Sequence, residues 1–230
     1  MSKISDFLNH NFYFVFYPEL GGGHHLRNLI SLDRSFFPLG AINHDILYQN
    51  LLSWYNDPTA IKAHALPVVG SNNAHTLINP TEFEQYLDSI DFAQYKNSTH
   101  PCHATEIYRN DIQNLKNRSM LILTVKDSIS YDIINERAEK RYGQHLLTKT
   151  SGDLNVEHPG YTFEKFVYSR EAAMKHLGIA DHRVFEIEVR YFYKQDITPI
   201  INNINKFYNL NISLDQAQEL HKLWQTMLWR

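Results

Sequence analysis

The sequence predicts an α/β fold in which a central, mainly parallel sheet is flanked by helices. Two segments, Phe12–Tyr17 and Arg118–Val125, are nearly continuous apolar runs, as expected for strands that are covered on both faces. A third segment, Val184–Val189, is rich in apolar residues that alternate with charged ones. Helical patterns separate these strands, and strands that alternate with helices are typical of a parallel sheet.

The first strand leads through a glycine-rich turn into a helix. Pro18 ends the strand because proline cannot donate a hydrogen bond to a sheet, and three consecutive glycines follow at Gly21–Gly23. From Leu26 onward, apolar residues recur at the spacing of one helix face. The local order is therefore strand, tight turn and helix.

The rest of the chain is predicted to be mostly helical, in one domain over residues 1–230. Helices are expected at His44–Tyr55, Pro80–Ile90, Asp127–Gly143, Glu164–Leu177, Ile197–Tyr208 and Ser213–Leu228. The third of these should direct Ile129, Ile133 and Ile134 inward. Other segments are expected to be a weak strand or loop at Leu66–Val69, a turn at Pro101 with a short helix to Leu115, and a loop or lid at Gln144–Gly160.

The composition limits the classes of partner and the compartment. A net charge of -3 gives no reason to expect nucleic acid or an anionic membrane as the main partner. The only cysteine, Cys102, cannot form an internal disulfide, so we expect a reducing, cytoplasmic setting. No apolar run reaches the roughly 18 residues that a membrane span needs, and we expect a soluble protein.

The glycine-rich turn is a candidate anion site. In α/β sheets, ligands bind beyond the carboxyl ends of strands, and a helix that begins there offers free N–H groups and a positive dipole to a phosphate. Glycine allows the backbone to approach the anion closely. The segment contains neither G-x-x-x-x-G-K-[ST] nor G-x-G-x-x-G. Glycines that serve only a tight turn remain the alternative.

The segment YPELGGGHHLRNLI resembles the 5′-phosphosulfate-binding loop of the sulfotransferases, whose usual pattern is Tyr-Pro-Lys-Ser-Gly-Thr-Thr-Trp-Leu. Tyr17 and Pro18 match directly, Gly22 matches the loop glycine, and Leu26 matches if one extra residue is allowed. SMLILTVKDSISYDII resembles the strand and turn that bind the cofactor's 3′-phosphate in that family. The C-terminal segment that begins at VRYFYKQDITP resembles the family's final strand and helices.

The resemblance touches about a third of the chain and implies a P-loop-like three-layer fold. It also implies binding of 3′-phosphoadenosine 5′-phosphosulfate and transfer of its sulfate to a small hydroxyl or amine acceptor, such as a carbohydrate. The cofactor-binding residues that it implies are Pro18, Gly21, Gly22, Gly23, His24, His25, Leu26, Lys126, Ser128, Ser130 and Arg137.

Two positions depart from the family's chemistry. The loop lysine that stabilises the leaving group is absent, and Glu19 or Leu20 stands in its place. A protonated His24 or His25 is the nearby candidate for that role. Lys126 lies about where the family has an arginine, and a lysine lacks the two-pronged hydrogen bonding of the guanidinium.

The candidate general bases are His100 and His103, with Glu106 behind them. Two other classes of function remain open. A relative that has lost transfer activity could keep the anion pocket, as the missing lysine indicates. A metal-dependent hydrolase could use His24-His25 and His100-x-x-His103, although adjacent helical residues point about 100° apart and no H-E-x-x-H occurs. No metal site is predicted, and a nucleophilic Cys102 is weaker still.

Overall fold

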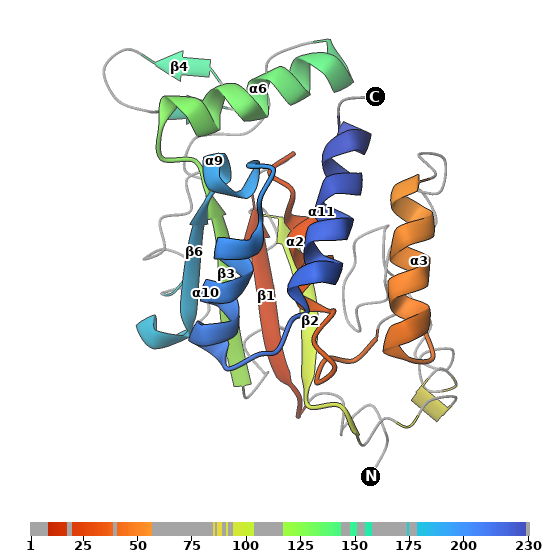
Figure 1. Ribbon diagram of the computed structural model, residues 1–230. Coiled ribbons are helices and arrows are strands. Elements are labelled where there is room, and N and C mark those ends of the chain that lie inside the picture. The colour runs from red at the N-terminus through yellow and green to blue at the C-terminus, as the bar shows by residue number, and fades with distance from the viewer. Residues whose placement is uncertain are drawn as a thin grey trace.

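The computed structural model of the protein contains a four-stranded parallel sheet, so the predicted α/β class is confirmed (Figure 1). The strand order is β2-β1-β3-β6. The strands are β1 (Asn11–Tyr17), β2 (Asn97–His103), β3 (Asn117–Thr124) and β6 (Val184–Glu188). The structure describes residues 9–17, 20–38, 41–56, 85, 87–88, 91, 94–103, 117–143, 148–150, 155–157, 174 and 179–228.

The two central strands, β1 and β3, are buried on both faces. Phe14 and Phe16 point to one face of the sheet and Val15 to the other, and all three are at most 1% exposed. The two strands are almost entirely apolar because each face packs against a covering layer rather than facing water. The register sets Tyr17, the last residue of β1, beside His103 of β2.

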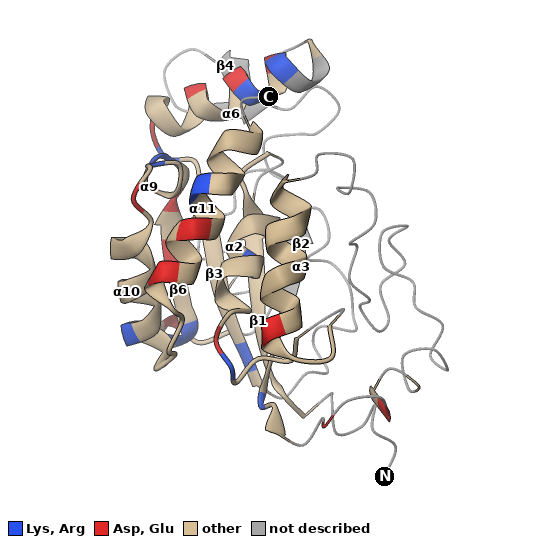
Figure 2. Ribbon diagram, turned by 45° about the vertical axis from the view of Figure 1, so that its right-hand side comes forward, with Lys and Arg blue, Asp and Glu red and all other residues tan. Residues whose placement is uncertain are grey.

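Helices flank the sheet and extend beyond its carboxyl end (Figure 1). They are α2 (Gly23–Ile30), α3 (His44–Asn56), α6 (Ser128–Tyr142), α9 (Val189–Phe192), α10 (Thr198–Tyr208) and α11 (Leu214–Leu228). The core formed with the sheet includes Leu26, Ile201, Ile204 and Leu220, all fully buried. Figure 2 shows few charged residues on α2 and α3 and both signs of charge on α6 and α11.

The predicted helices that fall on described residues are confirmed at α2, α3, α6, α10 and α11. Within α6, Ile134 is buried as expected, but Ile129 is 54% exposed and its expected inward direction is wrong. None of the described helices has the length and apolar character that crossing a membrane requires. The expected elements at Leu66–Val69, Pro80–Ile90 and Glu164–Leu177 lie outside the described residues, apart from a few isolated positions.

Three predicted segments need correction. The turn expected at Pro101 is instead strand β2, which pairs along its length with β1. Proline is compatible with a strand at the edge of a sheet, where one side carries no ladder. The third predicted strand ends at Glu188, and Val189 begins α9. The expected loop at Gln144–Gly160 contains an antiparallel pair, β4 (Thr148–Thr150) and β5 (Asn155–Glu157).

Candidate functional site at the glycine-rich loop

The glycine-rich loop connects the carboxyl end of β1 to the first turn of α2. Leu20 and Gly22 both adopt left-handed backbone conformations, with φ of 62° and 88°. Gly22 is the N-cap of α2, and the Leu26 N–H donates to its carbonyl oxygen over 3.0 Å. Pro18 and Glu19 lie outside the described residues. The predicted order of strand, tight turn and helix is therefore present at the carboxyl end of the sheet, where α/β proteins bind ligands.

Two of the three glycines are required by close packing. A methyl group at Gly22 would stand 2.8 Å from Phe192 Cε1 and 2.9 Å from Trp224 Cζ2. At Gly23 it would stand 1.8 Å from Cδ1 of Tyr17, well inside contact distance. The backbone of the loop thus lies directly against three aromatic rings, and this packing explains Gly22 and Gly23 before any ligand is considered.

Arg137 reaches the loop from α6, more than a hundred residues away in sequence. Its Nη1 donates to the Leu20 carbonyl oxygen and to the Tyr193 hydroxyl. The Tyr193 hydroxyl in turn donates to the same Leu20 oxygen over 2.5 Å. The guanidinium also lies 5.3 Å from the centre of the Tyr193 ring and 5.9 Å from that of Trp224. Arg137, one of the predicted cofactor-binding residues, is therefore hydrogen-bonded to the loop itself.

The two adjacent histidines have opposite environments. His24 is exposed, and its ring meets the Tyr17 ring at a centroid distance of 5.5 Å. His25 is only 2% exposed and stacks on Trp224, with ring centres 4.3 Å apart and planes 11° apart. Consecutive helical residues point about 100° apart, so one side chain faces solvent while the other enters the core.

His25 belongs to a buried chain of hydrogen bonds. Its Nδ1 lies 2.7 Å from the Tyr55 hydroxyl, and its Nε2 lies 3.0 Å from Nδ1 of His221. Nε2 of His221 lies 2.7 Å from the Lys194 carbonyl oxygen. That oxygen can only accept, so His221 carries its proton on Nε2, His25 donates from Nε2, and Tyr55 donates to Nδ1 of His25. Asn28 Nδ2 completes the chain by donating to the Tyr55 oxygen over 2.9 Å.

This arrangement favours a neutral His25. Burial lowers the pKa of His25 well below 6.5, and the neighbouring His221 and Arg137 lower it further. Burial likewise lowers the pKa of His221. Both ring nitrogens of His25 are occupied by protein partners, so this side chain has no nitrogen left to contact a bound anion.

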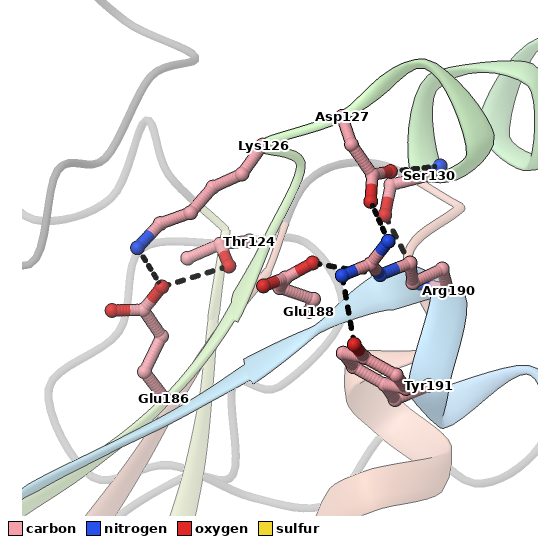
Figure 3. A network of polar contacts seen from close by, with 8 residues as sticks. All are labelled: Thr124, Lys126, Asp127, Ser130, Glu186, Glu188, Arg190 and Tyr191. Carbon is pink, nitrogen blue, oxygen red and sulfur yellow. Dashed lines mark hydrogen bonds and ion pairs between the residues drawn. The ribbon is translucent and has the colours of Figure 1, made fainter.

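The predicted 3′-phosphate residues lie at the β3–α6 turn, in a network of charged side chains (Figure 3). Lys126 is paired with Glu186. The buried Ser130 hydroxyl accepts the N–H of Arg190 over 3.1 Å. The Arg190 guanidinium pairs with Asp127 at 2.8 Å and with Glu188 at 2.9 Å.

The network contains three carboxylates, Asp127, Glu186 and Glu188, and two cations, Lys126 and Arg190. An incoming phosphate would therefore compete with side chains that already neutralise the cations. The sequence interpretation missed Glu186, Glu188 and Arg190. The two-residue spacing of Glu186 and Glu188 in VFEIEVR was the available signal for the two carboxylates, because alternate strand residues share a face. Arg190 follows the strand, in α9. Ser128, at the first position of α6, is exposed.

Replacing Asp127 with Ala is expected to destabilise the protein by about 1–2 kcal/mol, because the carboxylate is the N-cap of α6. Its Oδ1 accepts the Ser130 N–H over 2.7 Å, and its Oδ2 pairs with Arg190. Asp127→Asn is the matched control, since asparagine caps equally well but carries no charge. Urea unfolding should rank wild type, Asp127→Asn and Asp127→Ala in decreasing stability. Equal stabilities for the two variants would assign the effect to the ion pair instead of the cap.

The predicted site residues therefore form three groups. The loop glycines, Leu26 and Arg137 come together; Lys126, Ser128 and Ser130 gather at the neighbouring turn; and His25 enters the core. His103 is the last residue of β2, and His100 lies earlier in the same strand. Glu106 lies outside the described residues. Within the described part of the chain, no three His, Cys, Asp or Glu side chains are close enough to hold a metal.

The fold and the loop define the class as an α/β protein with a glycine-rich strand-to-helix loop at the carboxyl end of a parallel sheet. No known protein family matches the sequence, and no curated protein does. Among solved structures it is similar to retinol dehydratase, a sulfotransferase, in complex with androsterone and the inactive cofactor PAP. The identity is 13%, the TM-score 0.33, and the match covers 92% of this chain but only 63% of that enzyme. The function is therefore inferred from this chain's own residues.

Proposed function

We propose that this protein binds 3′-phosphoadenosine 5′-phosphosulfate at the loop Leu20–Gly23 and transfers the sulfate to a small hydroxyl or amine acceptor, such as a carbohydrate. The observation that carries the proposal is the loop itself. It turns from the end of a central strand into a helix N-terminus through two left-handed residues, and a guanidinium from α6 contacts it. Backbone N–H groups and a helix dipole at such a point favour a phosphate or sulfate group.

Each part of the loop has a role in this proposal. The first turn of α2 presents N–H groups to the anion, and Arg137 adds positive charge while it holds the Leu20 carbonyl. The bound cofactor supplies an activated sulfuryl group. His103, at the end of the adjacent strand, is the residue whose position suits a base that removes the acceptor proton.

A second candidate, binding without transfer, is favoured by the state of His25. Stabilising the leaving group requires a cation or a free donor beside it. The loop has no lysine, and both nitrogens of His25 are committed to Tyr55 and His221. A nucleotide- or anion-binding protein with this loop needs no such donor.

Calorimetric titration with 3′-phosphoadenosine 5′-phosphate tests the binding. Arg137→Gln is expected to weaken binding about tenfold, since one charge-assisted contact at the loop is lost. Lys140→Gln is the matched control: it removes one positive charge from the same helix at an exposed position, where Lys140 pairs with Glu136. No binding to wild type at high micromolar ligand would contradict the proposal.

Transfer is tested by incubating the protein with 3′-phosphoadenosine 5′-phosphosulfate and a panel of sugars, phenols and amines. His103→Gln should lower turnover by roughly 10²–10⁴ without changing nucleotide affinity, because a base acts only on the acceptor. His100→Gln is the comparison within the same strand. Binding without transfer to any acceptor would select the second candidate.

A further inference from the structure

Arg27 is a buried cation in the middle of α2. Only 3% of the residue is exposed. Its Nε and Nη2 donate to the side-chain oxygen of Asn28 over 3.3 and 2.8 Å. That oxygen is neutral, so the positive charge is solvated by an amide and not balanced by a carboxylate.

Among the described elements that pack around α2, acidic residues are few, and the two in α11, Asp215 and Glu219, are exposed. The sequences of β1, β2 and α2 contain no Asp or Glu at all. α3 contains one, Asp45 in its first turn, which is exposed and pairs with Arg34 at 3.3 Å. The remainder of α3 is uncharged, as Figure 2 shows. The buried Asp33, which follows α2, bonds to Ser35 and Asn211.

No described residue therefore forms an ion pair with Arg27. A buried charge without a counter-ion is costly, and proteins normally pair it or bind a ligand to it. Burial lowers the pKa of Arg27, and the hydroxyls of Tyr17 and Tyr55 partly oppose this effect. The Tyr55 hydroxyl is already bonded to His25 and Asn28, so the guanidinium itself is the group that would bind an oxyanion.

Hydrogen bonds link Arg27 to α3 through Asn28. Asn28, whose side-chain oxygen accepts from the guanidinium, donates to the Tyr55 hydroxyl of α3 over 2.9 Å. The next turn of α2 contacts β2, where the Ser31 hydroxyl lies 3.3 Å from that of Thr99. Arg137 approaches from α6 at the other flank of the loop.

We propose that Arg27 binds an oxyanion group of a ligand between α2, β2 and α3, and that this group is the missing counter-ion. This part of the proposal rests on the proposed function, which offers two sources for the oxyanion. It is either the sulfate or phosphate end of the nucleotide or an acidic group of the acceptor. In the second case the acceptor is a carboxylate-bearing or otherwise anionic molecule.

Thermal unfolding with added anions tests the assignment. Sodium sulfate, sodium succinate and 3′-phosphoadenosine 5′-phosphate are each compared with sodium chloride at equal ionic strength. A saturating ligand should raise the Tm of wild type by about 5 °C above the chloride value. Arg27→Met keeps a similar volume without charge, and should lose the anion-specific rise while remaining folded without added anion. Arg27→Lys keeps the charge and should retain part of the rise.

The pattern of responses identifies the source. An Arg27-dependent rise with sulfate and the nucleotide supports the cofactor end, whereas a rise with succinate alone supports an anionic acceptor. Equal responses of wild type and Arg27→Met to every anion would overturn the assignment. So would a Glu19→Gln variant that is destabilised as strongly as Arg27→Met and shows no anion effect, because Glu19 would then be the counter-ion. Nucleotide binding that depends on Arg137 but not on Arg27, together with no Arg27-dependent response to succinate, would overturn it and leave the proposed function intact.

Discussion

Replacing Gly22 with Ala should destabilise the protein by about 2–5 kcal/mol, since two costs add. A left-handed backbone, with φ of 88° at Gly22, costs an L-residue roughly 1–2 kcal/mol. The new methyl group would also stand 2.8 Å from Phe192 and 2.9 Å from Trp224, and overpacking of this kind costs about 1–3 kcal/mol. Denaturant unfolding followed by circular dichroism measures the loss.

Gly143→Ala is the matched control. Gly143 ends α6 with φ of 68°, and a methyl group there would meet nothing within 4 Å. This variant should therefore show the backbone cost alone, about 1–2 kcal/mol. The difference between the two variants measures how tightly the loop packs against the aromatic rings. Equal losses would mean that Trp224 and Phe192 can move aside, and that the loop is not held by them.

The stability of the protein is expected to fall steeply as the pH drops below about 6.5. His10, His25 and His221 are buried, and burial lowers the pKa of each in the folded state, to about 4 for His10. The unfolded chain binds protons near pH 6.5 that the folded chain rejects, so stability is complete above that pH and is lost as the pH falls toward the folded-state values. Each histidine contributes up to about 1.4 kcal/mol per pH unit.

Charged groups near His25 and His221 also shift the pKa values of these two histidines. Arg137 lowers the pKa of His25, and Asp196 raises that of His221 against the larger effect of burial. His221→Gln should reduce the slope of unfolding free energy against pH between about 6.5 and 5 by up to about 1.4 kcal/mol per pH unit. His182→Gln, at an exposed position, is the control substitution. An unchanged slope in His221→Gln would show that His221 accepts a proton in the folded protein.

The local pattern of apolar residues predicted the elements that are buried on both faces or along one regular helix face. β1 and β3 are apolar along their length because both faces are covered, and α2, α10 and α11 repeat apolar residues at helical spacing. β2 was missed because NSTHPCH has neither property. Its strand conformation is supported by hydrogen bonds to β1, and pairing between distant segments leaves little trace in the local sequence.

The site was predictable in kind but not in detail. The glycine-rich turn and the helix after it follow from residues that are neighbours in sequence. The approach of Arg137 to Leu20, and the contact between His25 and His221, join residues 117 and 196 positions apart. No local pattern reports such contacts, because they depend on how the helices pack over the sheet.

By itself, the sequence determined the α/β class and the strand-to-helix loop, because these depend on composition and short-range spacing. Only the tertiary structure decided the difference between His24 and His25, the carboxylates beside Lys126 and the burial of Arg27. Adjacent histidines look identical in a sequence. Packing against Trp224 and Tyr55 makes one of them a neutral core residue and leaves the other in solvent.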